Sequence, residues 1–212
     1  MTPDDKSTSM NVAENIHTPL MFPLMLNVTS TPIVLVGGGK IVAQLTVLEE
    51  HSARNIHVFA AEAKEELIQA AGARLSIRWP QAEDFDRIRP QLVFVADVDD
   101  ERATEFRSHA RRVGALVHVQ DRIPYCDFHL PARVRRGHLQ VTVSTDGTAA
   151  GLSRLIREFL EKNVFGPEWA GRVEELAAAR RIWKREGLSF DALGHAIRKF
   201  VADRGWLNRR VY

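Results

Sequence analysis

The first 120 residues of the chain alternate between short apolar runs and segments in which apolar residues recur at helical spacing. A continuous apolar run such as residues 33–36 is typical of a strand buried on both faces of a sheet. Strands that alternate with helices predict a parallel sheet with right-handed crossovers, and so an α/β fold. The predicted strands are residues 23–28, 33–36, 55–60, 75–79, 90–96 and 115–119, and the predicted helices are residues 40–50, 63–71 and 101–112.

The pattern changes after residue 120. Pro124, Pro131 and a second group of strands, clearest at residues 139–144, fill a mixed region. Beyond Gly147 the apolar residues follow a helical period to the end of the chain, which predicts helices. The predicted divisions are a flexible leader at 1–18, a sheet domain at 19–120, a mixed region at 121–150 and a helical domain at 151–212.

The composition is globular, because 45% of the 212 residues are hydrophobic and the 29 basic and 27 acidic residues nearly cancel. This balance excludes a disordered or fibrous chain. Cys126 is the only cysteine, which excludes an intramolecular disulfide and favours a reducing compartment. No apolar run approaches the ~18 residues of a membrane span, and the polar start lacks a signal-peptide core. We expect a soluble cytoplasmic protein with no membrane partner.

The two halves of the chain differ in charge. Residues 1–120 hold 12 basic and 16 acidic residues, whereas residues 121–212 hold 17 and 11. A basic second half predicts an anionic ligand or partner there. The alternative is that the basic helices are simply solvated. Tryptophans at helical core spacing argue against nucleic acid as the partner.

A glycine turn follows the first buried strand. Gly37, Gly38 and Gly39 lead directly into a helix, which is the phosphate-binding arrangement of a Rossmann-like domain. Gly37 suits a tight turn, and Gly39 allows the backbone to approach a pyrophosphate. Val42 departs from the pattern, since Gly or Ala is expected at that position. The alternative is a plain glycine turn.

An acidic residue near the end of the second strand ordinarily binds the ribose hydroxyls of a dinucleotide. Glu62 lies at that place, and a carboxylate there favours NAD over its 2′-phosphate form. The alternative is an ordinary acidic residue in the first turn of a helix.

Several segments, taken in order, resemble one family. The chain is similar to the precorrin-2 dehydrogenases of siroheme synthesis, which include the N-terminal module of siroheme synthase. This resemblance implies a Rossmann-like NAD-binding domain, a small dimerisation region at 121–150 and a C-terminal helical domain. The matching segments are residues 22–28, 36–39, 96–100, 126–128, 130–132, 136–141 and 144–147.

The resemblance also implies an activity. Members of the family oxidise precorrin-2 to sirohydrochlorin with NAD⁺ as hydride acceptor, and some also insert ferrous iron as a ferrochelatase. They are homodimers, so a second copy of the chain is an expected partner. The sequence holds no His-Glu-x-x-His spacing, and no resident metal is predicted.

Site residues carry over onto matching positions. The family's catalytic aspartate falls on Asp121, for which the alternative is a turn aspartate. Its cofactor contacts fall on the glycine turn and on Lys40, Ile41, Ala61 and Glu62. Ser144 falls near the substrate, with helix capping as its alternative. Arginine binds carboxylates in pairs of hydrogen bonds, so a basic cluster suits this polycarboxylate substrate: Arg133, Arg136, Arg154 and Arg157.

The chain also departs from the family's pattern at several crevice positions, which makes it a divergent member. These departures keep a second hypothesis open, a chelatase-only or non-catalytic relative that binds a tetrapyrrole or a dinucleotide. The departing residues are Val42, Gln44, Leu45, His118 and Asp146.

Overall fold

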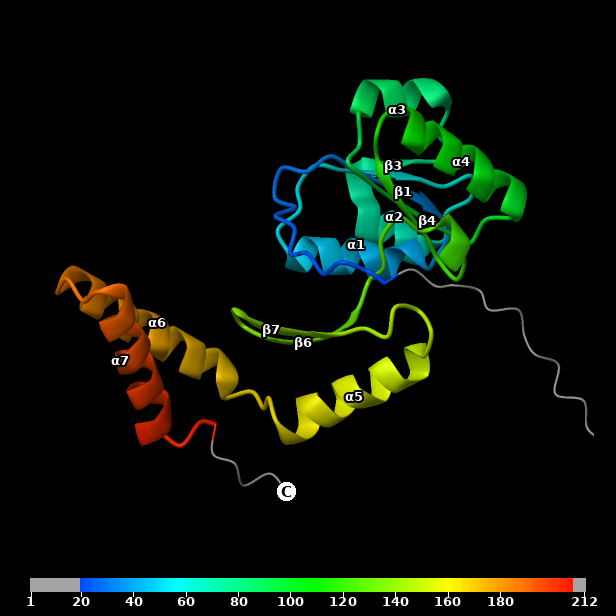
Figure 1. Cartoon of the computed structure of the whole chain (residues 1–212). Helices are drawn as coiled ribbons and strands as arrows, with labels where there is room; N and C mark the ends of the chain where they lie inside the picture. The colour runs from blue at the N-terminus through cyan, green and yellow to red at the C-terminus, as the bar shows by residue number, and fades with distance from the viewer. Residues whose placement is uncertain (1–19, 208–212) are drawn as a thin grey trace, which may run out of the picture. The chain divides into compact units, whose positions relative to one another are not determined.

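A computed structural model describes residues 20–207 of the chain (Figure 1). They form two compact units that divide between residues 129 and 130. The predicted leader at 1–18 lies outside the described residues. Residues 121–129, predicted as the start of the dimerisation region, belong to the first unit instead. Within it, Asp127 N donates to Val117 O over 2.7 Å.

The first unit is built on a parallel sheet, which confirms the predicted α/β class. Within residues 20–129 five strands lie in the order β3-β2-β1-β4-β5, and every neighbouring pair is parallel. The two central strands, β1 and β4, are buried along their whole length, as their continuous apolar runs predict. The strands are β1 Ile33–Gly37, β2 Ile56–Phe59, β3 Leu75–Ser76, β4 Leu92–Ala96 and β5 Leu116–Val119.

Helices cover both faces of this sheet and create two apolar cores (Figure 1). On one face Ile41 and Leu45 of α1 and Leu67 of α2 pack against the sheet. On the other face Phe85 of α3 and Phe106 of α4 do so. The helices are α1 Ile41–Glu50, α2 Glu65–Ala71, α3 Ala82–Ile88 and α4 Asp100–Arg112, with 3₁₀ turns at Gly72–Arg74 and Ile123–Tyr125.

Three sequence predictions in this unit differ from the structure. The predicted strand at residues 23–28 is wrong: the segment has no regular structure, and its side chains, apart from Val28, are mostly exposed. The predicted strand at 75–79 shrinks to β3, because Arg78 turns away to pair with Asp84. Helix α3 was not predicted, since its seven residues carry only two buried side chains, those of Asp84 and Phe85.

The second unit begins with an antiparallel hairpin, β6 Ala132–Arg136 and β7 Leu139–Val143. Gly137 makes the turn with a φ of +57°, a conformation that glycine adopts at little cost. Three helices follow, α5 Ala150–Asn163, α6 Trp169–Arg185 and α7 Phe190–Asp203. Helix α5 contacts the hairpin, and α6 contacts α7.

Aromatic edge-to-face contacts close the helical pair α6 and α7. Phe200 lies 5.7 Å from Trp183 and 5.5 Å from Trp206, centre to centre. These tryptophans are therefore packing residues, as their helical spacing indicates. Among residues 20–207, no helix combines the length and apolar character that crossing a membrane requires.

We predict that Gly37→Ala destabilises the first unit. A Cβ at Gly37 would lie 1.7 Å from the main-chain oxygen of Ala96, and the glycine has a φ of +135°. Since backbone must move, the free energy of unfolding should fall by about 2 kcal/mol or more. Urea denaturation measures this change.

The matched control is Gly39→Ala, because a Cβ at Gly39 meets nothing within 4 Å. Its free energy of unfolding should stay within about 0.5 kcal/mol of the parent. Equal losses in the two variants would contradict the close approach of β1 and β4.

Candidate functional site

The carboxyl ends of β1 and β4 form the edge of the sheet at which a ligand is expected. The order of the strands reverses between β1 and β4, because the chain leaves β1 toward β2 on one side and β4 toward β5 on the other. Ligands of open α/β sheets bind outside the carboxyl ends of the strands at this switch point. The glycine turn, Lys40 and the residues that follow β4 and β5 all lie at this edge.

The three glycines of the turn meet different surroundings. Gly37 leaves no room for a side chain against Ala96, and a Cβ at Gly38 would lie 3.1 Å from Oδ2 of Asp97. A Cβ at Gly39 would point into open space. The first two glycines thus bring β1 close to the end of β4, and the third keeps the approach to the start of α1 free of side-chain atoms.

Asp97, which sequence reasoning missed, accepts a hydrogen bond from the start of α1. Lys40 occupies the N-cap position of α1, and its side chain has no acceptor to offer the helix. Instead the main-chain N of Lys40 donates to Oδ2 of Asp97 over 2.9 Å. A carboxylate is favoured there by the free N–H groups and the helix dipole. The one sequence signal was an acidic residue directly after a buried strand.

The ammonium of Lys40 lies between two carboxylates. Its Nζ is 3.3 Å from Oδ2 of Asp121 and 3.5 Å from Oδ1 of Asp97. These contacts, with the Asp121 hydrogen bond as the largest cause, raise the pKa of Lys40 above its ordinary value. The structure therefore brings together Lys40 and Asp121, which the resemblance assigned to the cofactor and to catalysis.

The side chain of Ile41 is fully buried in the core. Its main-chain N donates to Gly38 O over 3.2 Å, so the cofactor contact expected of Ile41 stays a prediction. One turn beyond Lys40, Gln44 Nε2 donates to Oε1 of Gln120 over 2.9 Å. The Oε1 atom of Gln44 is buried and, within the described part of the chain, has no hydrogen-bond partner. Lys40 at the N-cap of α1 and Gln44 one turn later therefore both contact the segment that follows β5.

The end of β2 offers a free carboxylate. Glu62 is exposed, and no residue within 20–207 forms a hydrogen bond or ion pair with it. A cation also lies at this end of the sheet, since the Arg78 guanidinium stands 5.2 Å from the ring centre of Phe59. Arg78 makes two hydrogen bonds of 2.6 and 2.8 Å to Asp84, and these hold the pKa of Asp84 well below its usual range. Ala61 lies beside Glu62, with its side chain partly buried.

His118 and Cys126 are packing residues. The Nδ1 of His118 lies 3.1 Å from the main-chain oxygen of Phe128, and burial lowers the pKa of the imidazole. The thiol of Cys126 donates to Val119 O over 3.1 Å, and burial raises its pKa. Residues 20–207 contain no group of three His, Cys, Asp or Glu side chains placed to hold a metal ion.

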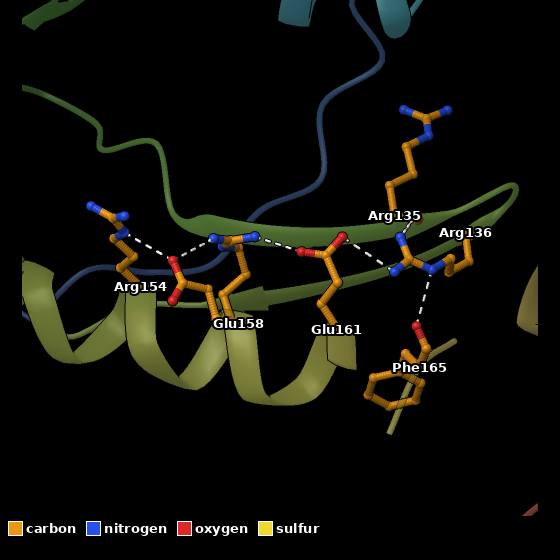
Figure 2. Close-up of polar contacts among 7 residues, drawn as sticks. Arg135, Arg136, Arg154, Glu158, Glu161 and Phe165 are labelled. Carbon is orange, nitrogen blue, oxygen red and sulfur yellow. Dashed lines mark hydrogen bonds and ion pairs between the residues drawn. The ribbon is translucent and has the colours of Figure 1, made fainter. Parts of the chain in front are cut away.

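In the second unit Arg136 is held by structural contacts. Figure 2 shows its guanidinium between Glu161 and the main chain of Phe165. The distances are 3.2 Å from Nη2 to Glu161 Oε1 and 3.0 Å from Nε to Phe165 O. Only 19% of the Arg136 side chain is exposed. Arg136 therefore joins β6 to the end of α5.

The arginines of α5 continue this arrangement as a row of ion pairs (Figure 2). Arg157 lies 2.6 Å from Glu161 and 3.0 Å from Glu158, and Arg154 lies 2.9 Å from Glu158. Three of the four predicted substrate arginines are thus brought together, but each faces a carboxylate of the chain itself. Their binding of substrate stays a prediction.

The fourth arginine, Arg133, lies on the other face of the hairpin. Side chains alternate along a strand, so Arg133 and Arg135 share the face opposite to that of Val134 and Arg136. Figure 2 shows the Arg135 side chain directed away from α5. Arg133 is half-buried and pairs with Thr142 in the register of the hairpin.

Ser144 does not cap α5. Its Oγ donates to Oδ1 of Asp146 over 3.4 Å and accepts from Asp146 N over 3.1 Å. The neighbouring Thr145 contacts the start of the helix instead, since its Oγ1 accepts from Ala149 N over 3.2 Å and lies 3.0 Å from Ser153 Oγ. The capping alternative for Ser144 is therefore wrong, and its place near a substrate stays a prediction.

The parallel sheet, the glycine turn at its switch point and the free carboxylate after β2 define a dinucleotide-binding α/β domain. Residues 24–132 match a family described as "Putative NAD(P)-binding". Residues 136–163 match a second family, described as the central part of a sirohaem biosynthesis protein. The chain belongs to the NAD(P)-binding family, and the predicted resemblance to the siroheme-synthesis enzymes is confirmed.

Siroheme synthases are among the relatives of this chain. The enzyme of Sodalis glossinidius (strain morsitans) is 32% identical over 77% of this chain and 38% of its own length. That of Psychrobacter sp. (strain PRwf-1) is 30% identical over 76% of this chain and 33% of its own length. The chain thus spans about a third of the length of the curated relatives it matches.

A solved structure, "SirC, precorrin-2 dehydrogenase", shares the fold. The TM-score is 0.69 at 21% sequence identity, over 89% of this chain and 93% of the other. This likeness covers the α/β domain and the helical part that follows it, and it confirms the predicted fold class.

Proposed function

We propose that this chain oxidises precorrin-2 to sirohydrochlorin with NAD⁺ as the hydride acceptor. The observation that carries the proposal is the convergence of the glycine turn and Asp121 at one edge of the sheet, linked by Lys40. The siroheme synthase relatives and the precorrin-2 dehydrogenase neighbour support the choice of substrate.

The reaction removes a hydride and a proton from the macrocycle. The nicotinamide, when bound, supplies the hydride acceptor. Asp121 is 75% exposed at the carboxyl edge of the sheet, where a carboxylate is able to accept the proton or polarise a pyrrole N–H.

The residues at this edge of the sheet suit a dinucleotide. Among residues 20–207 the main-chain N–H groups of Gly38 and Gly39 have no hydrogen-bond partner, and we propose that they receive the pyrophosphate at the open start of α1. Glu62, exposed and free in the described structure, suits the ribose hydroxyls. A carboxylate repels a 2′-phosphate, so we propose NAD rather than NADP as the cofactor.

For the substrate carboxylates we propose the basic residues of the second unit. Arg133 and Arg136 come from the hairpin, and Arg154 and Arg157 from α5. Arg154 is the most exposed of the three ion-paired arginines, at 77%, so it exchanges its partner Glu158 for a substrate carboxylate most easily. Ser144 joins this group as a hydroxyl donor.

A chelatase is the second candidate function, with ferrous iron as a substrate. Gln44 and His118, which depart from the family's pattern, both lie beside the segment that carries Asp121. A relative that binds the tetrapyrrole without oxidising it is consistent with such changes near the catalytic position.

We include a cytoplasmic location in the proposal because Cys126, the one cysteine, is free.

We also propose a homodimer, because α5 presents an apolar face that residues 20–207 leave exposed. The face consists of residues at positions i, i+3, i+4 and i+7, which share one side of a helix. A second copy of this chain is the occupant that the family resemblance favours. The exposed fractions are 51% for Leu152, 63% for Leu155, 36% for Ile156 and 49% for Phe159.

The first test measures the turnover of precorrin-2 in the presence of NAD⁺, with the absorbance of NADH as the readout. Asp121→Asn should lower kcat by about 100-fold or more, because the base is lost while the fold is kept. Asp203→Asn, at an exposed ion pair on α7, is the control and should keep kcat. Full activity of Asp121→Asn would refute the role of Asp121. Metal insertion into sirohydrochlorin without any NADH formation would favour the chelatase.

The second test concerns the cofactor. Glu62→Gln should reduce the preference for NAD⁺ over NADP⁺ by about tenfold, which corresponds to about 1.4 kcal/mol. Isothermal titration with each dinucleotide measures the two Kd values. Glu66→Gln, an exposed glutamate of the next helix, is the control. An unchanged preference in Glu62→Gln would remove Glu62 from the site.

The third test concerns assembly. Leu155→Asp places a charge in the middle of the α5 face and should weaken dimerisation at least about tenfold, as read by analytical ultracentrifugation. Ile182→Asp, at a residue of α6 that is 45% exposed, serves as the control. A parent chain that sediments as a monomer would contradict the proposed dimer.

A further inference from the structure

Lys40 makes contacts with two strand ends at once. Asp97, directly after β4, receives the main-chain N–H of Lys40 at 2.9 Å and its ammonium at 3.5 Å. The same ammonium donates a hydrogen bond of 3.3 Å to Oδ2 of Asp121, which follows β5. Asp97 thus contacts both the main-chain N–H and the ammonium of Lys40. These two contacts direct the lysine side chain along the carboxyl edge of the sheet.

The two carboxylates lie on neighbouring strand ends. The strand ladder continues from β4 to the residue before Asp121, since Gln120 N donates to Val95 O over 2.9 Å. Asp97 and Asp121 both have left-handed backbone conformations, with φ of +54° and +63°, so each begins a sharp turn away from the sheet. Two like charges this close repel each other unless a cation lies between them.

Asp121 depends on this cation for its orientation. Its side chain is 75% exposed, and in the described part of the chain Lys40 is its hydrogen-bond partner. His118 lies within the electrostatic range of Asp121, but its Nδ1 contacts the main-chain oxygen of Phe128. Without Lys40 the carboxylate would rotate freely in solvent and would be repelled by Asp97.

We propose that Lys40 is the positioning residue of Asp121, clamped for this task by Asp97. Lys40 holds the carboxylate of Asp121 in one orientation at the carboxyl edge of the sheet. This inference rests on the proposed function, because it assigns Lys40 a part in the step that Asp121 serves. It differs from the role of cofactor contact that the resemblance implies for Lys40.

The kinetic test compares Lys40→Met with Lys40→Arg. A misplaced base costs up to about 100-fold in rate, so Lys40→Met should lower kcat by about 10- to 100-fold. The KM for precorrin-2 and the Kd for NAD⁺ should stay within about threefold, because uniform binding is not lost. Lys40→Arg keeps the cation and should restore kcat to within about threefold of the parent. Adding Asp121→Asn to Lys40→Met should lower kcat no further than Asp121→Asn alone.

The matched control is Lys199→Met. Lys199 forms an ion pair of the same kind with Asp203, at 2.9 Å on α7, and its loss should leave kcat unchanged. The proposal is overturned if Lys40→Met keeps the kcat of the parent. It is also overturned if Lys40→Met raises only the Kd for NAD⁺, since Lys40 is then a cofactor contact alone.

A spectroscopic readout tests the same contact without cofactor or turnover. In protein labelled with ¹³C at the aspartate carboxyl carbons, the Asp121 resonance is the one that disappears in Asp121→Asn. Lys40→Met should shift this resonance, and Lys199→Met should not. An unmoved Asp121 resonance refutes the contact. A shifted resonance in a protein that never oxidises precorrin-2 refutes the proposed function and leaves the Lys40–Asp121 contact standing.

Discussion

The carboxyl edge of the sheet depends on the close approach of the ends of β1 and β4. Their register runs to the last pair, Gly37 opposite Ala96, and the Ala96 oxygen occupies the space that a side chain at Gly37 would need. A residue other than glycine there would push the two strand ends apart. The start of α1 and the turns after β4 and β5 take their positions from this contact.

Charge then organises the edge that the glycine contact creates. The first unit has an acidic balance, yet two of its carboxylates, Asp97 and Asp121, lie together where an anionic dinucleotide is expected. Lys40 resolves this conflict by lying between them. In the second unit Glu158 and Glu161 form ion pairs with Arg136, Arg154 and Arg157. A net charge summed over half of the chain therefore overstates how many cations are free for a ligand.

The central strands and the glycine turn could be predicted because their signals are local. A continuous run of β-branched and other apolar residues such as 33–36 is typical of a strand covered on both faces. The apolar run at 23–28 misled the prediction, because apolar character alone does not place a segment beside a sheet. Helix α3 escaped notice because one buried apolar residue, Phe85, creates no periodicity.

The site was predictable only in part. Asp121 came from a resemblance, and nothing local distinguishes it from a turn aspartate. Its partner Lys40 lies 81 residues away in the chain, a separation that no spacing rule spans. The ion pairs of α5 were different, since Arg154 and Glu158 stand four residues apart and such pairs are readable on any helix. The prediction counted these arginines without the glutamates beside them. It therefore overestimated the number of cations that are free to bind a ligand.

The central claim is that a dinucleotide binds at the carboxyl edge between β1 and β4. Titration of the ¹⁵N-labelled chain with NAD⁺, read by amide chemical shifts, tests it most directly. We expect saturable shifts at concentrations below about 1 mM, largest at Gly38, Gly39 and Ile41 and present at Glu62. Shifts confined to the second unit, or no saturable shift in the first, would contradict the account.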